Sequence, residues 1–408
     1  MAIEKVPIDR FLELSKQFPV LDVRSPGEYS HAHIPGAFNL PLFTDEERKV
    51  IGTAYKQQSR QAAIKIGLDY FGPRMSSIVE FVESLISNLP PAIGLTNASV
   101  GMSDSRLPTP HSRLVLIHCW RGGMRSAAIA WLLDLYGFKI YTLAGGYKKY
   151  RAWVVETFSF PFSFNILGGF TGSGKTYVLE ELRKKGAAAI NLEKLAHHKG
   201  SAFGNIGMPK QPSQEMFENL LCHELRKLSQ EFQTPGIKSS LNSLSEDIID
   251  SKSSLVDLIE RTIKHKPQNI NRIWLEDESQ RIGQINIPPP LWNNMRQSPI
   301  FFLAIPFEER LRHIVQEYGI LDKERMAEAI VRIQKRLGGL ETKMALRHLE
   351  EDDIESCFRL LLKYYDKWYS KGLHSREQLS ALLNNIECTT VNAERNASKI
   401  IEKETVLI

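Results

Sequence analysis

Residues 117–126, Ile-His-Cys-Trp-Arg-Gly-Gly-Met-Arg-Ser, hold a cysteine in a loop suited to anion binding. Cys119 directly follows the apolar run Leu114 to Ile117, which predicts a strand, and a helical pattern comes next. The loop therefore runs into a helix N-terminus with backbone N–H groups turned inward, a setting that attracts anions. Such a setting also favours the thiolate, so we predict that Cys119 is a catalytic nucleophile.

Four neighbours of Cys119 fit the same chemistry. Arg121 and Arg125 add positive charge, and Gly122 and Gly123 let the chain curl around an anion. Two kinds of enzyme use a cysteine loop of this shape, the sulfur-carrying rhodaneses and the cysteine phosphatases. The loop alone leaves both reactions open.

A second anion-binding motif lies further along the chain. Residues 169–176 read Gly-Phe-Thr-Gly-Ser-Gly-Lys-Thr, a complete G-x-x-x-x-G-K-[ST] pattern. It stands between a predicted strand, Phe164 to Leu167, and a predicted helix, Tyr177 to Lys185, which is the context of a P-loop. The residues expected to bind phosphate are Gly169, Gly172, Ser173, Gly174, Lys175 and Thr176. Among them, Thr176 would face a magnesium ion.

A predicted strand of the same part of the chain, Arg272 to Leu275, ends in Glu276 and Asp277. A carboxylate at such a strand end beside a P-loop holds magnesium in many enzymes, so we interpret these two as Walker-B-like residues. A solvated acidic turn is the alternative. No guanine-recognition motif follows, and the P-loop fits ATP, another nucleotide or a simple diphosphate.

Short apolar runs alternate with helical patterns over most of the chain, which predicts an α/β fold with parallel sheets. We predict a first domain over residues 1–155, a P-loop domain over 160–306 and a helical C-terminal region over 307–408. Two polar, Ser-rich stretches with little periodicity, 91–112 and about 231–270, are interpreted as insertions.

The composition is typical of a soluble globular protein: 408 residues, 42% hydrophobic, with a net charge of +5 that is compatible with an RNA partner. Four scattered cysteines form no C-x-x-C pair, so we expect neither a metal site nor a disulfide framework. We find no signal-peptide pattern and no apolar run long enough to span a membrane, which favours the cytoplasm.

A basic stretch lies in the predicted helical region. From Arg310 to Arg347 the sequence has nine Lys or Arg against five Asp or Glu. Arg332, Lys335 and Arg336 fall on one helix face, which fits either a surface that follows tRNA phosphates or an ordinary solvated face. Four aromatic residues further on are expected to serve packing: Tyr364, Tyr365, Trp368 and Tyr369.

Two strings near the N-terminus, Leu21 to Tyr29 and His33 to Ala37, resemble the early signatures of rhodanese domains. Cell-cycle dual-specificity phosphatases share that fold, so the signatures indicate the domain and not the reaction. The resemblance implies a structural role for Asp22 and Arg24.

The order of motifs along the whole chain resembles that of bacterial tRNA 2-selenouridine synthases, in which a rhodanese-like domain precedes a P-loop domain. The resemblance extends over roughly residues 15–350. The matching strings are Cys119 to Ser126, Ala144 to Tyr147, Gly169 to Thr176, Leu195 to Gly204, and Leu275 to Ser279.

The resemblance implies a chemistry in two steps. Members of this family transfer a geranyl group from geranyl diphosphate to the sulfur of wobble 2-thiouridine, in the tRNAs for Lys, Glu and Gln, and replace that sulfur with selenium from selenophosphate. On this reading Cys119 handles selenium, Arg121 and Arg125 hold selenophosphate, and Lys175 stabilises the departing diphosphate. No tightly bound cofactor is expected, and a magnesium ion would accompany the diphosphate.

Two other functions fit the residues. One is a rhodanese-type sulfurtransferase or cysteine phosphatase fused to a small-molecule kinase. The other is a tRNA-binding module that is gated by a nucleotide and has no catalytic activity.

Overall fold

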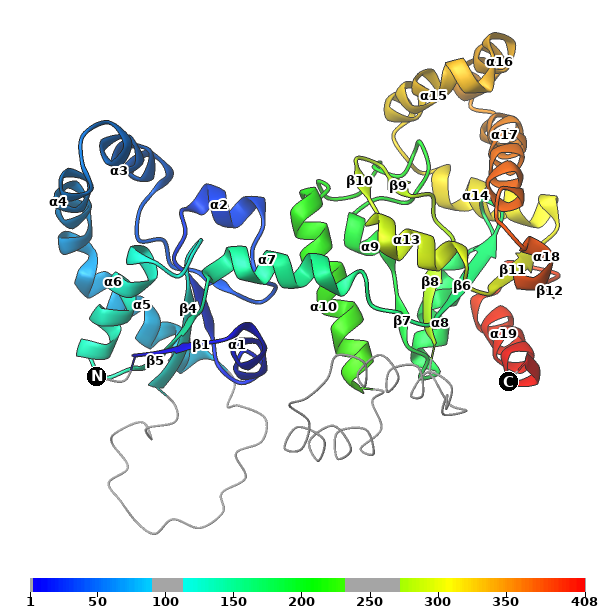
Figure 1. Ribbon diagram of the computed structural model, residues 1–408. Coiled ribbons are helices and arrows are strands. Elements are labelled where there is room, and N and C mark those ends of the chain that lie inside the picture. Colours follow the sequence, from blue (N-terminus) through cyan, green and yellow to red (C-terminus); the bar gives the residue numbers. More distant parts are fainter. Residues whose placement is uncertain (1–2, 90–112, 232–271, 408) are drawn as a thin grey trace. The chain divides into compact units, whose positions relative to one another are not determined.

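The computed structural model describes residues 3–89, 113–231 and 272–407. The chain divides into two compact units, Met1–Thr157 and Phe158–Ile408, and we describe each by itself (Figure 1). The predicted insertions 91–112 and 231–270 lie outside the described residues, except for residue 231 at the end of a helix.

Unit 1 is built on a five-stranded sheet in which all neighbouring strands are parallel. Its order is β1 (Ile3–Val6), β5 (Lys139–Leu143), β4 (Leu114–His118), β2 (Val20–Asp22) and β3 (Phe38–Asn39). The helices are α1 (Ile8–Leu14), α2 (Pro26–His31), α3 (Asp45–Gln57), α4 (Arg60–Phe71), the 3₁₀ turn η1 (Gly72–Arg74), α5 (Met75–Asn88), α6 (Met124–Leu135) and α7 (Gly146–Thr157). The parallel α/β architecture confirms the predicted fold class.

Strand β4 explains how this sheet positions Cys119. All five of its residues are buried, as expected for a parallel strand with both faces covered. Ile129 and Leu133 of α6 and Val82 of α5 pack in the same hydrophobic core as β4. Because the strand is fixed along its length, the loop that begins at Cys119 starts from a rigid support.

Unit 2 has a second parallel sheet, with the order β12 (Leu383–Glu387), β11 (Ile300–Ala304), β6 (Phe164–Gly169), β8 (Ile273–Glu276) and β7 (Ala189–Ile190). A small antiparallel pair, β9 (Arg281–Ile282) and β10 (Ile285–Asn286), follows β8. The helices are α8 (Lys175–Lys184), α9 (Leu192–Ala196), α10 (Gln214–Glu231), α13 (Pro289–Arg296), α14 (Phe307–Tyr318), α15 (Lys323–Leu337), α16 (Gly339–Glu350), α17 (Ile354–His374), α18 (Leu379–Leu382) and α19 (Ala393–Leu407). Parallel strands bring the loops after β6, β7 and β8 to one edge of this sheet.

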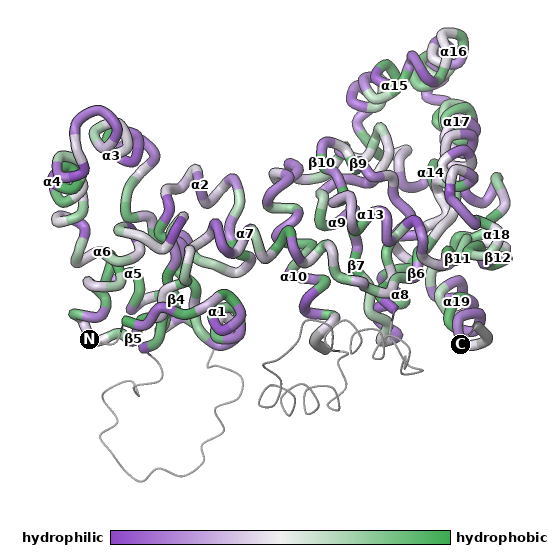
Figure 2. Tube along the Cα trace, in the orientation of Figure 1, coloured by the Kyte–Doolittle hydropathy of each residue, from purple (hydrophilic) through white to green (hydrophobic). Residues whose placement is uncertain are grey.

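The helices α14 to α17 form the predicted helical region and share a hydrophobic core of their own. Figure 2 shows many hydrophobic residues along α17. Phe203 and Ile206, from the loop after α9, pack into this core and so connect it to the P-loop domain. None of the helices in the described ranges has both the length and the apolar character required to cross a bilayer.

The predicted helical C-terminal region, 307–408, also contains a strand, β12. This strand pairs with β11 in the sheet, and α19 then packs against α8. The Asn165 amide donates a hydrogen bond of 2.5 Å to Glu404 on α19. The strand sequence Leu-Asn-Asn-Ile-Glu has only two apolar residues, so it carries no pattern of a buried strand.

Candidate active site

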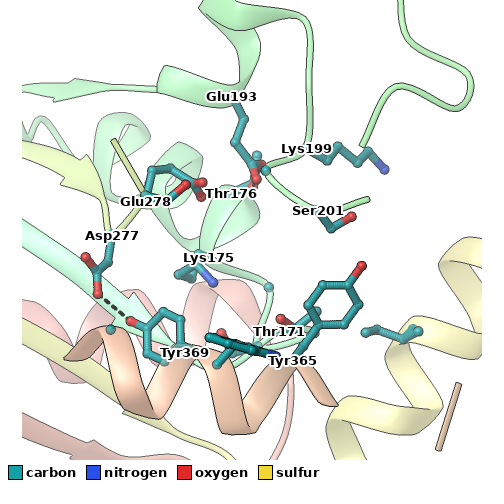
Figure 3. Close-up of a pocket in the computed structure, with 18 of the residues that line it drawn as sticks. Thr171, Lys175, Thr176, Glu193, Lys199, Ser201, Asp277, Glu278, Tyr365 and Tyr369 are labelled. Carbon is teal, nitrogen blue, oxygen red and sulfur yellow. Dashed lines mark hydrogen bonds between the residues drawn. The ribbon is translucent and has the colours of Figure 1, made fainter. Parts of the chain in front are cut away.

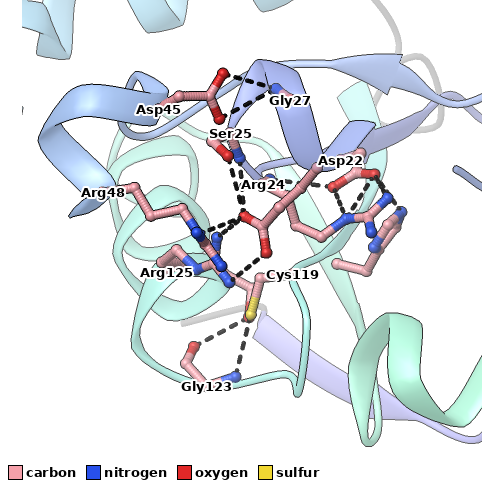
Figure 4. Close-up of polar contacts among 12 residues, drawn as sticks. Asp22, Arg24, Ser25, Gly27, Asp45, Arg48, Cys119, Gly123 and Arg125 are labelled. Carbon is pink, nitrogen blue, oxygen red and sulfur yellow. Dashed lines mark hydrogen bonds and ion pairs between the residues drawn. The ribbon is translucent and has the colours of Figure 1, made fainter. Parts of the chain in front are cut away.

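The Cys119 thiol lies at the carboxyl end of β4 and is 3% exposed. Its Sγ is 3.3 Å from the Ser126 hydroxyl oxygen, and the Gly123 N–H donates to it at 3.3 Å (Figure 4). Burial acts to raise the pKa of Cys119, but these hydrogen bonds and those of nearby backbone N–H groups outweigh burial, so the pKa lies below its ordinary value. These contacts favour the thiolate form of Cys119.

The two predicted anion-binding arginines differ in their surroundings. Arg125 donates to the Glu28 carboxylate at 2.6 Å, and Arg48 pairs with the same carboxylate at 2.9 Å (Figure 4). Burial alone would raise the pKa of Glu28, but these cations hold it below its ordinary value. Arg121 is exposed. At Gly122, φ is +65° and an added Cβ would lie 2.7 Å from the Leu143 carbonyl oxygen, so the turn requires glycine.

A buried charged cluster supports the strand end before Cys119. Arg24 pairs with Asp22 at 2.5 Å, both side chains being at most 2% exposed, and its guanidinium lies 3.7 Å over the Tyr147 ring. His118 Nε2 is 3.7 Å from Asp22. Burial lowers the pKa of His118 to about 4, so the imidazole is neutral near pH 7. This cluster therefore supports the strand end from which the loop begins.

The P-loop connects β6 to α8 and has three glycines with positive φ: Gly169, Gly172 and Gly174. At Gly172 an added Cβ would lie 2.9 Å from the Arg310 carbonyl oxygen. Lys175 Nζ donates to the Gly169 carbonyl at 2.9 Å, which holds the ammonium over the loop. Ser173 is buried, and its hydroxyl has no hydrogen-bond partner among the described residues.

The P-loop opens into a cavity of about 670 Å³. Two glutamates that the sequence analysis did not select meet there (Figure 3). The Thr176 hydroxyl donates to Glu193 on α9 at 2.9 Å. A Cβ added at Gly200 would lie 2.6 Å from Glu278 Oε2 and 3.1 Å from Glu193 Oε1, so the carboxylates approach each other. Burial, with the neighbouring carboxylate adding to it for Glu278, raises the pKa of both.

The predicted Walker-B-like residues have protein partners. Glu276 is fully buried, and its carboxylate accepts the Leu192 N–H at 2.9 Å. Asp277 lines the cavity, accepts a hydrogen bond of 2.6 Å from the Tyr369 hydroxyl and forms an ion pair with Arg376. Asp277 therefore ties the end of β8 to α17 and to the residue Arg376 that follows this helix.

Helix α17 lines the cavity with aromatic side chains. The four aromatic residues that are expected to serve packing also line the cavity: Tyr364, Tyr365, Trp368 and Tyr369. The Tyr369 hydroxyl accepts the Gly169 N–H at 3.1 Å, and its ring centroid is 5.7 Å from Lys175 Nζ. The P-loop thus faces an aromatic wall.

The three residues of the predicted basic face on α15 do not share one environment. Arg332 donates to the Ala202 carbonyl oxygen at 3.0 Å, and Lys335 is exposed. Arg336 lines the cavity, with its guanidinium 5.7 Å from the Trp368 ring centroid. Only Arg336 of the three lines the P-loop cavity.

A cluster of at least three His, Cys, Asp or Glu side chains arranged to hold a metal ion is absent from the residues that the structure describes. A cation at the P-loop would therefore depend on the Thr176 hydroxyl, a neighbouring carboxylate such as Glu193, and oxygens of the bound phosphate.

Two family models match this chain. The family model "tRNA 2-selenouridine synthase AAA domain" matches residues 162–237 and 256–396, and the model "Rhodanese-like domain" matches residues 8–68.

Relatives that align over most of this chain are also tRNA 2-selenouridine synthases. A tRNA 2-selenouridine synthase from Bdellovibrio bacteriovorus is 30% identical, with 92% of this chain and 94% of the relative aligned. Synthases from Pseudomonas fluorescens and Sulfurovum sp. are also 30% identical, covering 86% and 94% of this chain and 87% and 91% of their own lengths. The chain belongs to the tRNA 2-selenouridine synthase family.

Proposed function

We propose that this chain is a tRNA-modifying enzyme that replaces the sulfur of wobble 2-thiouridine with selenium. Its membership of the family supports the tRNA substrate, and we extend the proposal to the tRNAs for Lys, Glu and Gln and to a cytoplasmic location. The observation that supports the proposal is that each unit has a loop suited to an anion, the Cys119 loop in unit 1 and the P-loop in unit 2.

The first step in this proposal is S-geranylation at the P-loop. The thione sulfur attacks C1 of geranyl diphosphate, the C–O bond breaks, diphosphate leaves with the electron pair, and the uridine loses its N3 proton. Lys175 and the N–H groups at the start of α8 stabilise the charge of the departing diphosphate. Magnesium, held by Thr176 and Glu193, would neutralise further charge when it accompanies the diphosphate.

The second step delivers selenium. Selenium from selenophosphate replaces the geranylated sulfur at C2, geranyl thiol leaves, and water takes the phosphoryl group as phosphate. The Cys119 thiolate serves this step, and Arg121, Arg125 and the N–H groups of Gly122 and Gly123 hold the phosphoryl group.

The test is mass spectrometry of nucleosides from 2-thiouridine tRNA incubated with each donor separately and then together. Geranyl diphosphate alone should give the S-geranyl nucleoside, and both donors should give 2-selenouridine. Cys119→Ser should abolish selenation and spare geranylation, whereas Lys175→Ala should abolish geranylation. Cys388→Ser and Lys184→Ala are the matched controls.

Two results would contradict the proposal. One is 2-selenouridine formed at the normal rate by the Cys119→Ser variant. The other is turnover of thiosulfate with cyanide, of an aryl phosphate or of ATP, in the absence of any change to the tRNA.

A further inference from the structure

The cavity beside the P-loop has a polar end and an aromatic wall (Figure 3). Lys175, Thr176 and Glu193 lie at the polar end. The wall comes from one face of α17, where Tyr365, Trp368 and Tyr369 recur at the three- and four-residue spacing of a helix. A ligand with a charged head at Lys175 can therefore extend its remaining part along α17.

The tyrosines of this wall offer ring faces to a ligand because protein groups already occupy their hydroxyls. The Tyr369 hydroxyl donates to Asp277 at 2.6 Å and accepts from the Gly169 N–H at 3.1 Å. The Tyr365 hydroxyl accepts from the Ala202 N–H at 3.2 Å. Tyrosines whose hydroxyls are satisfied in this way favour an apolar or π-rich group over one that needs hydrogen bonds from them.

The aromatic wall lies next to Lys175, the cation expected to bind phosphate. Lys175 Nζ is 5.7 Å from the Tyr369 ring centroid, so the first carbon attached to a diphosphate on Lys175 would lie against this ring. Trp368, next to Tyr369 in the chain, is 39% exposed and also lines the cavity. Ligand carbons further from the diphosphate would extend toward this more open side.

We propose that the α17 wall is the binding site for the hydrocarbon chain of the diphosphate substrate, with the Tyr369 ring against the reacting carbon and Trp368 against the distal part of the chain. This inference rests on the proposed function and deepens it by naming the residues that select the substrate. The Tyr369 ring would also stabilise positive charge that develops at the first carbon as the C–O bond breaks.

The test compares the binding of four ligands to the full-length chain by calorimetry: geranyl diphosphate, dimethylallyl diphosphate, inorganic diphosphate and ADP. Trp368→Ala should weaken the binding of geranyl diphosphate about tenfold, the loss expected for a few buried CH₂ groups, and leave inorganic diphosphate unchanged. Trp368→Phe should restore most of the affinity. Trp368→Ala should weaken the binding of dimethylallyl diphosphate, whose chain is shorter, less than the binding of geranyl diphosphate.

Trp131→Ala is the matched control, since Trp131 is a 47% exposed tryptophan of the other unit. Equal weakening of inorganic diphosphate by Trp368→Ala, or a larger loss for ADP than for geranyl diphosphate, would overturn the inference. Wild-type protein that binds no geranyl diphosphate would overturn the proposed function as well. If the wild-type protein geranylates tRNA but the Trp368→Ala variant binds geranyl diphosphate with unchanged affinity, this inference alone would be overturned.

Discussion

The Arg125 guanidinium donates to the Glu28 carboxylate at 2.6 Å, so the arginine expected to hold an anion beside Cys119 already has an anionic partner. Arg48 pairs with the same carboxylate at 2.9 Å. An anionic selenium donor that binds in the Cys119 loop must therefore compete with Glu28 for Arg125. Glu28 is in this sense a carboxylate that tunes how strongly the loop attracts anions.

We predict that Glu28→Gln lowers the KM for selenophosphate by about threefold, because the neutral amide competes less well for Arg125. Glutamine still supports the capping box that Glu28 forms with Ser25 at the start of α2, so the loop should keep its shape. Selenation of geranylated tRNA as a function of donor concentration measures the effect. Glu13→Gln, which breaks an exposed pair with Arg10, is the control. An unchanged or higher KM in Glu28→Gln would refute the competition.

The pKa of Cys119 supplies a second prediction. Hydrogen bonds, first among them that of the Ser126 hydroxyl, lower the pKa of Cys119 against the effect of burial. Ser126→Ala should therefore raise this pKa, and the pH at which the thiol becomes half-reactive should move upward. The measurement is the rate of iodoacetamide alkylation at Cys119 against pH, followed by peptide mass spectrometry. Cys357, whose pKa burial raises to about 12, is an internal control that should stay unreactive over the same pH range. A midpoint that does not move would show that the backbone N–H groups alone stabilise the thiolate.

The sequence was informative wherever a function depends on neighbours in the chain. The Cys119 loop and the P-loop are local motifs, and the strands before them, β4 and β6, have continuous apolar runs. The fold class follows from the same local patterns, because strands alternate with helices.

Contacts between residues that are distant in the chain could not be predicted from the sequence. Glu28 is far from Arg125 in the chain, and Tyr369 reaches Gly169 from α17, so no spacing rule connects either pair. The position of Glu193 in the sequence could have indicated that it lies near the P-loop. It follows β7, and residues after the carboxyl end of a parallel strand lie at the same edge as the P-loop.

A third prediction concerns the bond between Tyr369 and Asp277, which joins α17 to the end of β8. Tyr369→Phe keeps the ring of the aromatic wall and removes this bond and the one from the Gly169 N–H, so it should lower the free energy of unfolding by about 1–2 kcal/mol. Asp277→Asn should destabilise the protein too. The double variant should lose less free energy of unfolding than the sum of the two single losses, because both changes remove one shared contact. Urea denaturation of the four proteins measures the cycle. Strictly additive losses would mean that the two side chains are not coupled.

The last prediction follows from Glu276, which lies fully buried at the end of β8 and whose Oε1 has no hydrogen-bond partner among the described residues. Burial raises its pKa from 4.5 to about 8. The folded chain therefore binds a proton at Glu276 that the unfolded chain releases near pH 4.5. The stability that depends on this proton is complete below pH 4.5 and is lost as the pH rises toward about 8.

Glu276→Gln tests this dependence, because glutamine stays neutral and its side-chain oxygen still accepts the Leu192 N–H. Between about pH 5 and pH 8, the free energy of unfolding of the wild type should fall more than that of the variant, by an amount on the order of a few kcal/mol. Urea denaturation at several pH values measures both curves, with Glu13→Gln as an exposed control. Parallel curves would show that Glu276 is ionised in the folded protein and would contradict the raised pKa.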